Sequence, residues 1–222
     1  MHKMRFAIVG FDLDGTLLDT SRDLAAAVNH ALAIDGRDPL PVARIMPMIG
    51  GGARHMLAQA LDATGGHDEA MLDRLEQALT EFYEANICVE TRPYAGLIET
   101  LDALAAQGIR LGVATNKRER FSRLLLDRLG LANRFACIIG GDTLGPGRGK
   151  PAPDMIRALI EQCGGGPAAF VGDSIYDVKA AHAADIPAIV CRFGFQPQPV
   201  ETMGADAIID HYDALVPTLK RL

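Results

Sequence analysis

The stretch that decides the fold is Phe6-Ala7-Ile8-Val9-Gly10-Phe11-Asp12-Leu13-Asp14-Gly15-Thr16, near the start of the chain. Its first six residues are apolar or small, as expected of a strand buried in a parallel sheet. Asp12 and Asp14 follow where that strand ends, and open α/β sheets bind ligands at this edge. Gly15 permits a sharp turn there. On their own the two carboxylates fit a solvated turn or a helix cap equally well, so the other strand ends have to decide.

Four further apolar runs predict strands at residues 110–115, 135–140, 168–172 and 187–191. Segments with helical periodicity separate these runs, and this alternation is typical of a parallel sheet with helices on its faces. The sequence therefore predicts an α/β protein with a Rossmann-like, doubly wound parallel sheet at its core.

A long, mainly helical segment separates the first strand from the next. Its pattern predicts helices at residues 21–35, 53–64 and 68–86, with Gly36, Gly65 and Gly66 as stops. A single crossover does not need so many residues, so we interpret residues 19–92 as a small inserted α-helical cap domain that covers the sheet edge. Residues 1–18 and 93–222 then form the catalytic core, which the chain re-enters through a helix near residues 97–107.

Composition limits the classes of protein. The 222 residues are 49% hydrophobic and 23% charged, which fits one globular unit or a core with a smaller insert. No apolar run reaches the roughly 18 residues of a membrane helix, and Asp12 comes too early for a signal peptide. We therefore expect a cytoplasmic protein with no membrane partner. The net charge of −6 and the lack of Lys/Arg clusters argue against a nucleic-acid partner, so an anionic substrate would need a local cation.

Cysteine and histidine offer no metal-binding pattern. The four cysteines, Cys88, Cys137, Cys163 and Cys191, form no C-x-x-C pair, so reduced, buried thiols are the expectation. The histidines lack ligand spacing as well. Only His55 lies close enough to a candidate loop to suggest a functional role.

Two polar segments follow later strands. Thr115 and Asn116 end the strand at 110–115, where their hydroxyl and amide groups could bind phosphoryl oxygens; the alternative is an N-cap for the next helix. Lys150 stands just before prolines suited to a helix start, where a cation and backbone N–H groups can meet an anion. An isolated exposed lysine is usually only solvated.

A third segment, Gly172-Asp173-Ser174-Ile175-Tyr176-Asp177, follows the strand at 168–172. Asp173 and Asp177 are four residues apart and face the same side of a helix start. Their oxygens are ligands of the kind that Mg²⁺ needs. A helix start whose acids are favoured by the helix dipole explains the pair equally well when the segment is taken alone.

Together, these motifs resemble the haloacid dehalogenase superfamily, whose phosphatases carry D-x-D-G-T, a Thr or Ser strand end, a Lys and a G-D-x-x-x-D element in this order. The match spans nearly the whole chain, and the helical segment stands where one class of these enzymes carries a cap. The resemblance implies Mg²⁺-dependent hydrolysis of a phosphate monoester through an aspartyl-phosphate. Asp12 would be the nucleophile, and Asp14 the acid and base that serves both half-reactions.

The resemblance also implies how the phosphoryl group and the metal are held. Thr115 and Lys150 would form the phosphate-binding pair, with Asn116 beside them. Carboxylate and backbone oxygens would hold Mg²⁺, and one further acid would support them from behind. The metal-binding groups implied are the Asp12 carboxylate, the Asp14 backbone carbonyl and the Asp173 carboxylate, with Asp177 in support.

Substrate choice must come from the inserted helices, because the core motifs contact only the phosphoryl group. Residues 49–57 form a glycine loop that enters a helix, where N–H groups near Gly52 and the Arg54 side chain could receive an anionic leaving group. A plain interhelical turn with a solvated arginine has equal weight. The loop is similar to that of phosphoglycolate phosphatases, which implies phosphoglycolate as a small phosphorylated substrate. Sugar phosphates, nucleotides and pyrophosphate are the alternatives, since relatives that act on them share the core motifs.

Two other functions fit part of the pattern. A β-phosphoglucomutase-like phosphomutase would return the phosphoryl group to a second hydroxyl, and it differs in the cap residues that exclude water. A phospho-accepting signalling switch also uses Asp, Thr and Lys around Mg²⁺, but it needs neither Asp14 nor an inserted lid. Net phosphate release separates the phosphatase from the mutase.

Overall fold

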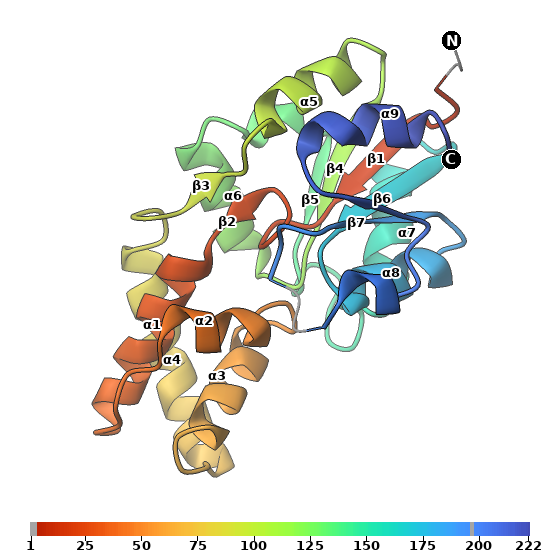
Figure 1. The fold of residues 1–222 in the computed structure, drawn as a ribbon. Coiled ribbons are helices and arrows are strands. Elements are labelled where there is room, and N and C mark those ends of the chain that lie inside the picture. The colour runs from red at the N-terminus through yellow and green to blue at the C-terminus, as the bar shows by residue number, and fades with distance from the viewer. Residues whose placement is uncertain (1–3, 196–197) are drawn as a thin grey trace.

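The computed structural model describes residues 4–195 and 198–222, and its sheet lies at the centre of Figure 1. The described strands follow the predicted ones to within two residues, and three short strands were not predicted. In chain order they are β1 (Ile8–Phe11), β2 (Leu18–Asp19), β3 (Arg92–Pro93), β4 (Arg110–Ala114), β5 (Cys137–Ile139), β6 (Ala168–Gly172), β7 (Ala188–Cys191) and β8 (Ala207–Ile209).

Six of these strands form one parallel sheet in the order β5-β4-β1-β6-β7-β8. The chain leaves β1 toward β4 and β5, and then returns to build β6, β7 and β8 on the other side. This reversal beside β1 is the switch point at which open α/β sheets bind ligands. Phe11 pairs with Val113 and with Val171, so the carboxyl ends of three adjacent strands are level. The prediction of a doubly wound parallel sheet is confirmed.

Helices cover both faces of the sheet (Figure 1). Val9 and Phe11 of β1 pack with helices α5, α6 and α9, whereas Ile8 packs with α7 and α8. Continuous apolar packing on both faces explains why β1 and β6 carry no polar side chains. The helices of the core are α5 (Leu97–Ala105), α6 (Glu119–Arg128), α7 (Asp154–Gln162), α8 (Ile175–Ala183) and α9 (Leu215–Leu219), with 3₁₀ turns η2 (Ala132–Arg134), η3 (Val200–Thr202) and η4 (Tyr212–Ala214).

A helical insertion stands at the carboxyl edge of the sheet (Figure 1). The short antiparallel pair β2 and β3 joins it to the core, and α1 packs along α4. The predicted insertion of helices after the first strand is confirmed, although the sequence pattern missed the four-residue helix α2. Its elements are α1 (Ser21–Ile34), α2 (Val42–Ile45), η1 (Met46–Met48), α3 (Ala53–Asp62) and α4 (Glu69–Ala85).

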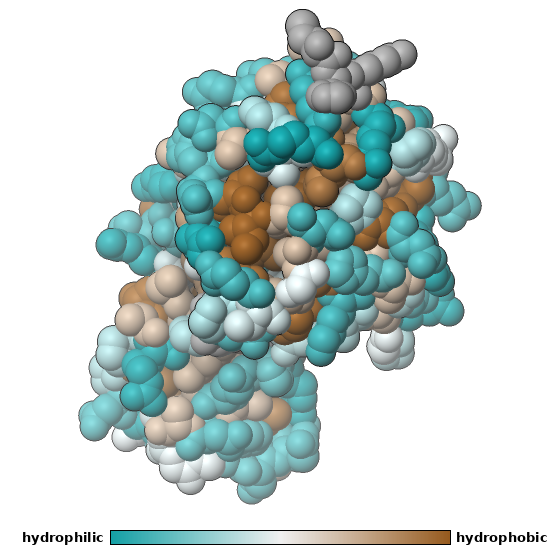
Figure 2. Space-filling view, turned by 45° about the vertical axis from the view of Figure 1, so that its right-hand side comes forward, coloured by the Kyte–Doolittle hydropathy of each residue, from teal (hydrophilic) through white to brown (hydrophobic). Residues whose placement is uncertain are grey.

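The surface of the insertion is largely hydrophilic, and hydrophobic residues gather in a patch over the core (Figure 2). Among the described residues, no helix combines the length and the apolarity that a bilayer crossing requires. Cys137, Cys163 and Cys191 are buried and reduced, as predicted. Cys88 is only partly buried, because it follows the end of α4 in a loop, so its predicted full burial is wrong.

Candidate active site

Asp12 lies directly beyond β1, where its backbone N–H donates to the carbonyl of Val171 at 2.9 Å. This bond extends the β1–β6 ladder by one residue and fixes the carboxylate at the sheet edge. Burial raises the pKa of the Asp12 carboxyl to about 6, although the Lys150 ammonium opposes that shift. The group is therefore an acid held in a nearly dry environment.

Lys150 supplies the cation beside Asp12. Its Nζ lies 2.9 Å from Asp12 Oδ1 and 2.5 Å from Asp177 Oδ1, and its side chain is only 1% exposed. Burial works against the charge, but the two carboxylates outweigh it and raise the pKa of Lys150. The predicted lysine is thus a buried counter-ion and not a solvated surface residue.

Asp173 and Asp177 enter the same cluster from the start of α8. Asp177 Oδ2 accepts bonds from the Ser174 backbone and hydroxyl at 2.9 and 2.6 Å, which caps the helix. Asp173 Oδ2 accepts the backbone N–H of Phe195 at 2.6 Å. A Cβ on Gly15 or Gly194 would lie 2.2 Å from Asp173 atoms, so both positions require glycine. The alternative interpretation of this segment, a helix start stabilised by acidic residues, is correct for Asp177, but it does not account for Asp173.

The three acids could hold a metal ion. Asp12, Asp173 and Asp177 each offer an oxygen, and these oxygens lie within 4.8 Å of one another. Lys150 supplies one positive charge against the three buried carboxylates. Burial also raises the pKa of Asp173, with the neighbouring acids adding to the shift. Uncompensated oxygen ligands of this kind fit a hard divalent cation such as Mg²⁺.

Asp14 turns its side chain away from this cluster. Its Oδ1 accepts the Thr20 hydroxyl at 2.7 Å, and its two oxygens lie 3.0 and 2.9 Å from the ammonium of Lys117. The sequence reasoning did not select Lys117, although it directly follows the Thr115-Asn116 strand end. Burial opposes the charge of Lys117, but Asp14 overcomes it and raises the pKa of the ammonium.

Thr115 and Asn116 lie beyond β4 at the same edge. Thr115 is 2% exposed and contributes no N-cap to α6, because the cap position is Arg118, so the cap alternative is wrong. The Asn116 amide donates to the carbonyls of Gly50 at 2.9 Å and Lys150 at 3.0 Å. Asn116 therefore joins the glycine loop of the insertion to the core, and its predicted contact with phosphate stays a prediction.

A cavity of about 260 Å³ lies between these groups and the insertion. Its core wall includes Asp12, Asp14 and Thr115, and its other wall includes the glycine loop with Gly52 and the α4 residue Tyr83. The predicted catalytic and cap residues thus meet around one space. His55 lines a separate hollow on the other side of the loop, so the structure does not bring it to this cavity.

Arg54 lines the cavity but is already paired within the insertion. Its guanidinium lies 2.6 Å from Glu69, 2.7 Å from Asp73 and 2.8 Å from Glu76. These partners stand 15 to 22 residues further along the chain, which sequence reasoning could not connect. The predicted role of Arg54 in substrate binding remains a prediction.

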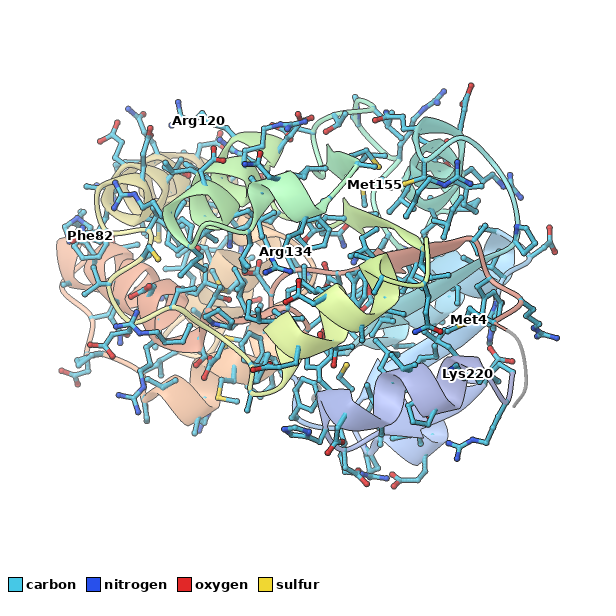
Figure 3. All side chains as sticks on the ribbon, turned by 90° about the horizontal axis from the view of Figure 1, so that it is seen from above. Met4, Phe82, Arg120, Arg134, Met155 and Lys220 are labelled. Atoms are coloured by element: carbon cyan, nitrogen blue, oxygen red, sulfur yellow. The ribbon has the colours of Figure 1, made fainter. Side chains whose placement is uncertain are left out.

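Contacts between α4 and α6 hold the insertion on the core. Arg118 lies 3.0 Å from Glu76, and Arg120, at the outer edge of α6 in Figure 3, pairs with Glu84. The Tyr83 and Phe121 rings meet edge to face, with centroids 5.6 Å apart. The cavity is therefore covered in this structure.

The fold and the site together define the class of protein. The family model described as haloacid dehalogenase-like hydrolase matches residues 6–185, and the chain belongs to this family. The prediction of a phosphatase-type enzyme of this family is confirmed.

Individual relatives narrow the comparison. The chain is 41% identical to the phosphoglycolate phosphatase of Agrobacterium fabrum, over 94% of this chain and 90% of that protein. It is 34% identical to the N-acetylmuramic acid 6-phosphate phosphatase of Pseudomonas aeruginosa, over 100% of this chain and 98% of that protein. A crystal structure of a predicted phosphoglycolate phosphatase from Haemophilus somnus superimposes with a TM-score of 0.90 at 31% identity, covering 96% of this chain and 98% of that one.

Proposed function

We propose that this protein is a Mg²⁺-dependent phosphatase that hydrolyses phosphoglycolate through an aspartyl-phosphate on Asp12. One observation carries the proposal: Asp12, Thr115, Lys150 and Asp173 follow four different segments of the core, yet they gather at one edge of the sheet, where Asp12 and Thr115 line the covered cavity. A nucleophile, an anion-binding cation and metal ligands at one sheet edge are what phosphoryl transfer requires.

In the first half-reaction, an Asp12 oxygen attacks phosphorus and the bond from phosphorus to the leaving oxygen breaks. Asp14 gives its proton to that oxygen, so the product leaves as an alcohol. Thr20 and Lys117 fix the Asp14 carboxyl at the cavity wall. In the second half-reaction Asp14 takes a proton from water as the water attacks phosphorus, which releases phosphate and restores the Asp12 carboxylate.

Charge compensation is the main task of the remaining residues. The Thr115 hydroxyl and the Lys150 ammonium donate hydrogen bonds to the phosphoryl oxygens that carry charge in the transition state. The Asp12 and Asp173 carboxylates and the Asp14 carbonyl would hold Mg²⁺, with Asp177 in support. When bound, the ion neutralises the phosphoryl dianion and lets an anionic nucleophile approach it.

Phosphoglycolate is the substrate that the observations favour. The relative from Agrobacterium fabrum bears that name, and it shares more residues with this chain than the N-acetylmuramic acid 6-phosphate phosphatase does. The cavity of about 260 Å³ is smaller than the roughly 300–1,000 Å³ usual for ligand sites, which suits a two-carbon compound better than an amino sugar.

Phosphate release from a panel of substrates tests the proposal. The panel contains phosphoglycolate, N-acetylmuramic acid 6-phosphate, sugar phosphates, nucleotides and pyrophosphate, each with Mg²⁺ and with a chelator in its place. We expect phosphoglycolate to lead in kcat/KM by several orders of magnitude and the chelator to stop turnover. Faster hydrolysis of another substrate would overturn the choice of substrate, and transfer without net phosphate release would indicate a mutase.

A further inference from the structure

A buried pair of side chains in the cavity has no part in the hydrolytic scheme beyond fixing Asp14. Lys117 comes from the core and Tyr83 from α4, and the Lys117 ammonium lies 4.6 Å from the centre of the Tyr83 ring. The Lys117 side chain is 6% exposed and Tyr83 is 3% exposed. Since the two residues come from different parts of the fold, the pair forms only where the insertion covers the sheet edge.

The Lys117 ammonium has hydrogen-bonding capacity to spare. An ammonium carries three N–H donors, and the Lys117 ammonium donates to the two oxygens of Asp14, with the Tyr83 side chain as its other polar neighbour. The Tyr83 ring stabilises the charge through its face but accepts no conventional hydrogen bond there. A donor therefore remains for an anion in the cavity.

The Tyr83 hydroxyl is also unused. It is buried next to the Lys117 ammonium, and within the described part of the chain it donates no hydrogen bond. Burial raises the pKa of Tyr83, so the phenol keeps its proton and can donate it in a hydrogen bond. A buried hydroxyl without a partner costs stability unless a ligand supplies an acceptor.

The other cations near the cavity pair with carboxylates other than the leaving-group acid Asp14. Arg54 pairs with three acids of the insertion, and Arg118 lies 3.0 Å from Glu76. Lys150 lies between Asp12 and Asp177. Lys117 contacts both the leaving-group acid Asp14 and the α4 residue Tyr83 of the insertion.

We propose that Lys117 and Tyr83 form a subsite for the carboxylate of the leaving group; this inference rests on the proposed function. One carboxylate oxygen accepts a Lys117 N–H, and the other accepts the Tyr83 hydroxyl. In phosphoglycolate the carboxylate carbon is two bonds from the oxygen that leaves. Because that oxygen faces Asp14, and Lys117 contacts Asp14 directly, a short acid reaches both groups at once. Lys117 and Tyr83 thus set specificity for acidic leaving groups.

The experiment compares two substrates that differ at the proposed contact. Phosphoglycolate carries a carboxylate where 2-hydroxyethyl phosphate carries a neutral hydroxymethyl group. We would measure kcat and KM on both substrates for the wild type, Lys117→Met and Tyr83→Phe. The matched controls are Lys179→Met, at an exposed lysine of α8, and Tyr94→Phe, whose ring packs on Phe193 outside the cavity.

The wild type should prefer phosphoglycolate. The ratio of the two kcat/KM values should fall about 10- to 100-fold in Lys117→Met and roughly tenfold in Tyr83→Phe, mainly through KM for phosphoglycolate. The controls should keep the wild-type ratio. Tyr83→Phe removes one oxygen and keeps the ring on Lys117, so it provides the test even if Lys117→Met folds poorly.

Two outcomes would overturn the inference. Only the second of them would also reject the proposed function. If both variants lower turnover of the two substrates equally, the pair is only structural, and phosphoglycolate hydrolysis by the wild type still stands. If the wild type itself prefers 2-hydroxyethyl phosphate or releases no phosphate from either compound, the proposed function fails together with the subsite.

Discussion

A cluster of one cation and three acids stands behind each wall of the cavity, but the cluster in the core is buried and the one in the insertion is exposed to solvent. On the core wall, Lys150 stands among the three acids Asp12, Asp173 and Asp177, whereas on the wall of the insertion Arg54 stands among Glu69, Asp73 and Glu76. Lys150 is 1% exposed, but the side chain of Arg54 is 41% exposed. Water screens the excess negative charge of the insertion. The excess negative charge in the core is buried, so it needs a bound cation.

This difference assigns separate tasks to the two walls. A dry, charged cluster makes electrostatic effects large, so the core wall is suited to chemistry. In the solvent-exposed ion-pair network of the insertion, electrostatic effects are small, so this wall is suited to shaping and covering the cavity. Variants in the two walls should therefore differ by orders of magnitude in their effect.

The largest effect is expected from Asp12→Asn, which keeps the shape of the side chain but removes the nucleophile. We expect kcat for phosphate release to fall by at least about 10⁴-fold, as for other covalent nucleophiles. Asp213→Asn is the control, because the Asp213 side chain is 79% exposed. Turnover within tenfold of the wild type would remove Asp12 from the mechanism.

A large loss of stability is expected from Lys150→Met. It leaves three buried acids without their ammonium, and breaking such a pair costs about 3–5 kcal/mol of unfolding free energy. Urea unfolding of the metal-free protein would measure this, with Lys179→Met as the exposed control. A loss below about 1 kcal/mol, typical of a surface pair, would mean that the core wall is wetter than the structure indicates.

The pH dependence of stability tests how deeply the Asp12 carboxylate of the core wall is buried. Burial raises the pKa of Asp12 from 3.8 to about 6, so the folded metal-free protein binds a proton that the unfolded chain has lost between these values. Its unfolding free energy should therefore fall as pH rises from about 4 to 6, by about 2 to 3 kcal/mol from this group. Subtracting the same curve for Asp12→Asn isolates the effect; a flat difference would contradict the raised pKa.

The smallest effect is expected from Arg54→Met. The guanidinium already has three carboxylate partners in an exposed network, so we expect kcat/KM for phosphoglycolate to fall less than about threefold. Arg44→Met changes another arginine of the insertion, outside the cavity, and serves as the control. A loss of tenfold or more confined to KM would make Arg54 a substrate-binding residue after all.

Three groups of the core wall were predictable from sequence because each follows an apolar run. Parallel strands in register bring their carboxyl ends together, so Asp12, Thr115 and Asp173 had to meet once the strands were recognised. The order of the strands was not predictable, because local patterning does not record which strands pair. The short strand β8 was missed since its apolar run of three residues, Ala207–Ile209, is too short to give a strand signal.

The chemistry of the insertion was much less predictable. Helical periodicity located α1, α3 and α4, but it cannot state which charged side chains meet between helices. Arg54 resembles a free cation in the sequence and is paired in three dimensions. Lys117 lies in a run of charged residues, and only its contact with Asp14 distinguishes it. Tyr83 fits the apolar face of α4, and only the fold turns it to the cavity.

The most direct test of the mechanism is to trap the phosphoryl group in Asp14→Asn. This variant keeps the nucleophile but lacks the base for the second half-reaction, so a substrate with a good leaving group, such as p-nitrophenyl phosphate, should give one burst of nitrophenol. Acid quenching and peptide mass spectrometry should then find a phosphoryl group on Asp12. A burst of nitrophenol with the phosphoryl group on another residue, or on none, would contradict the assignment of Asp12 as the nucleophile.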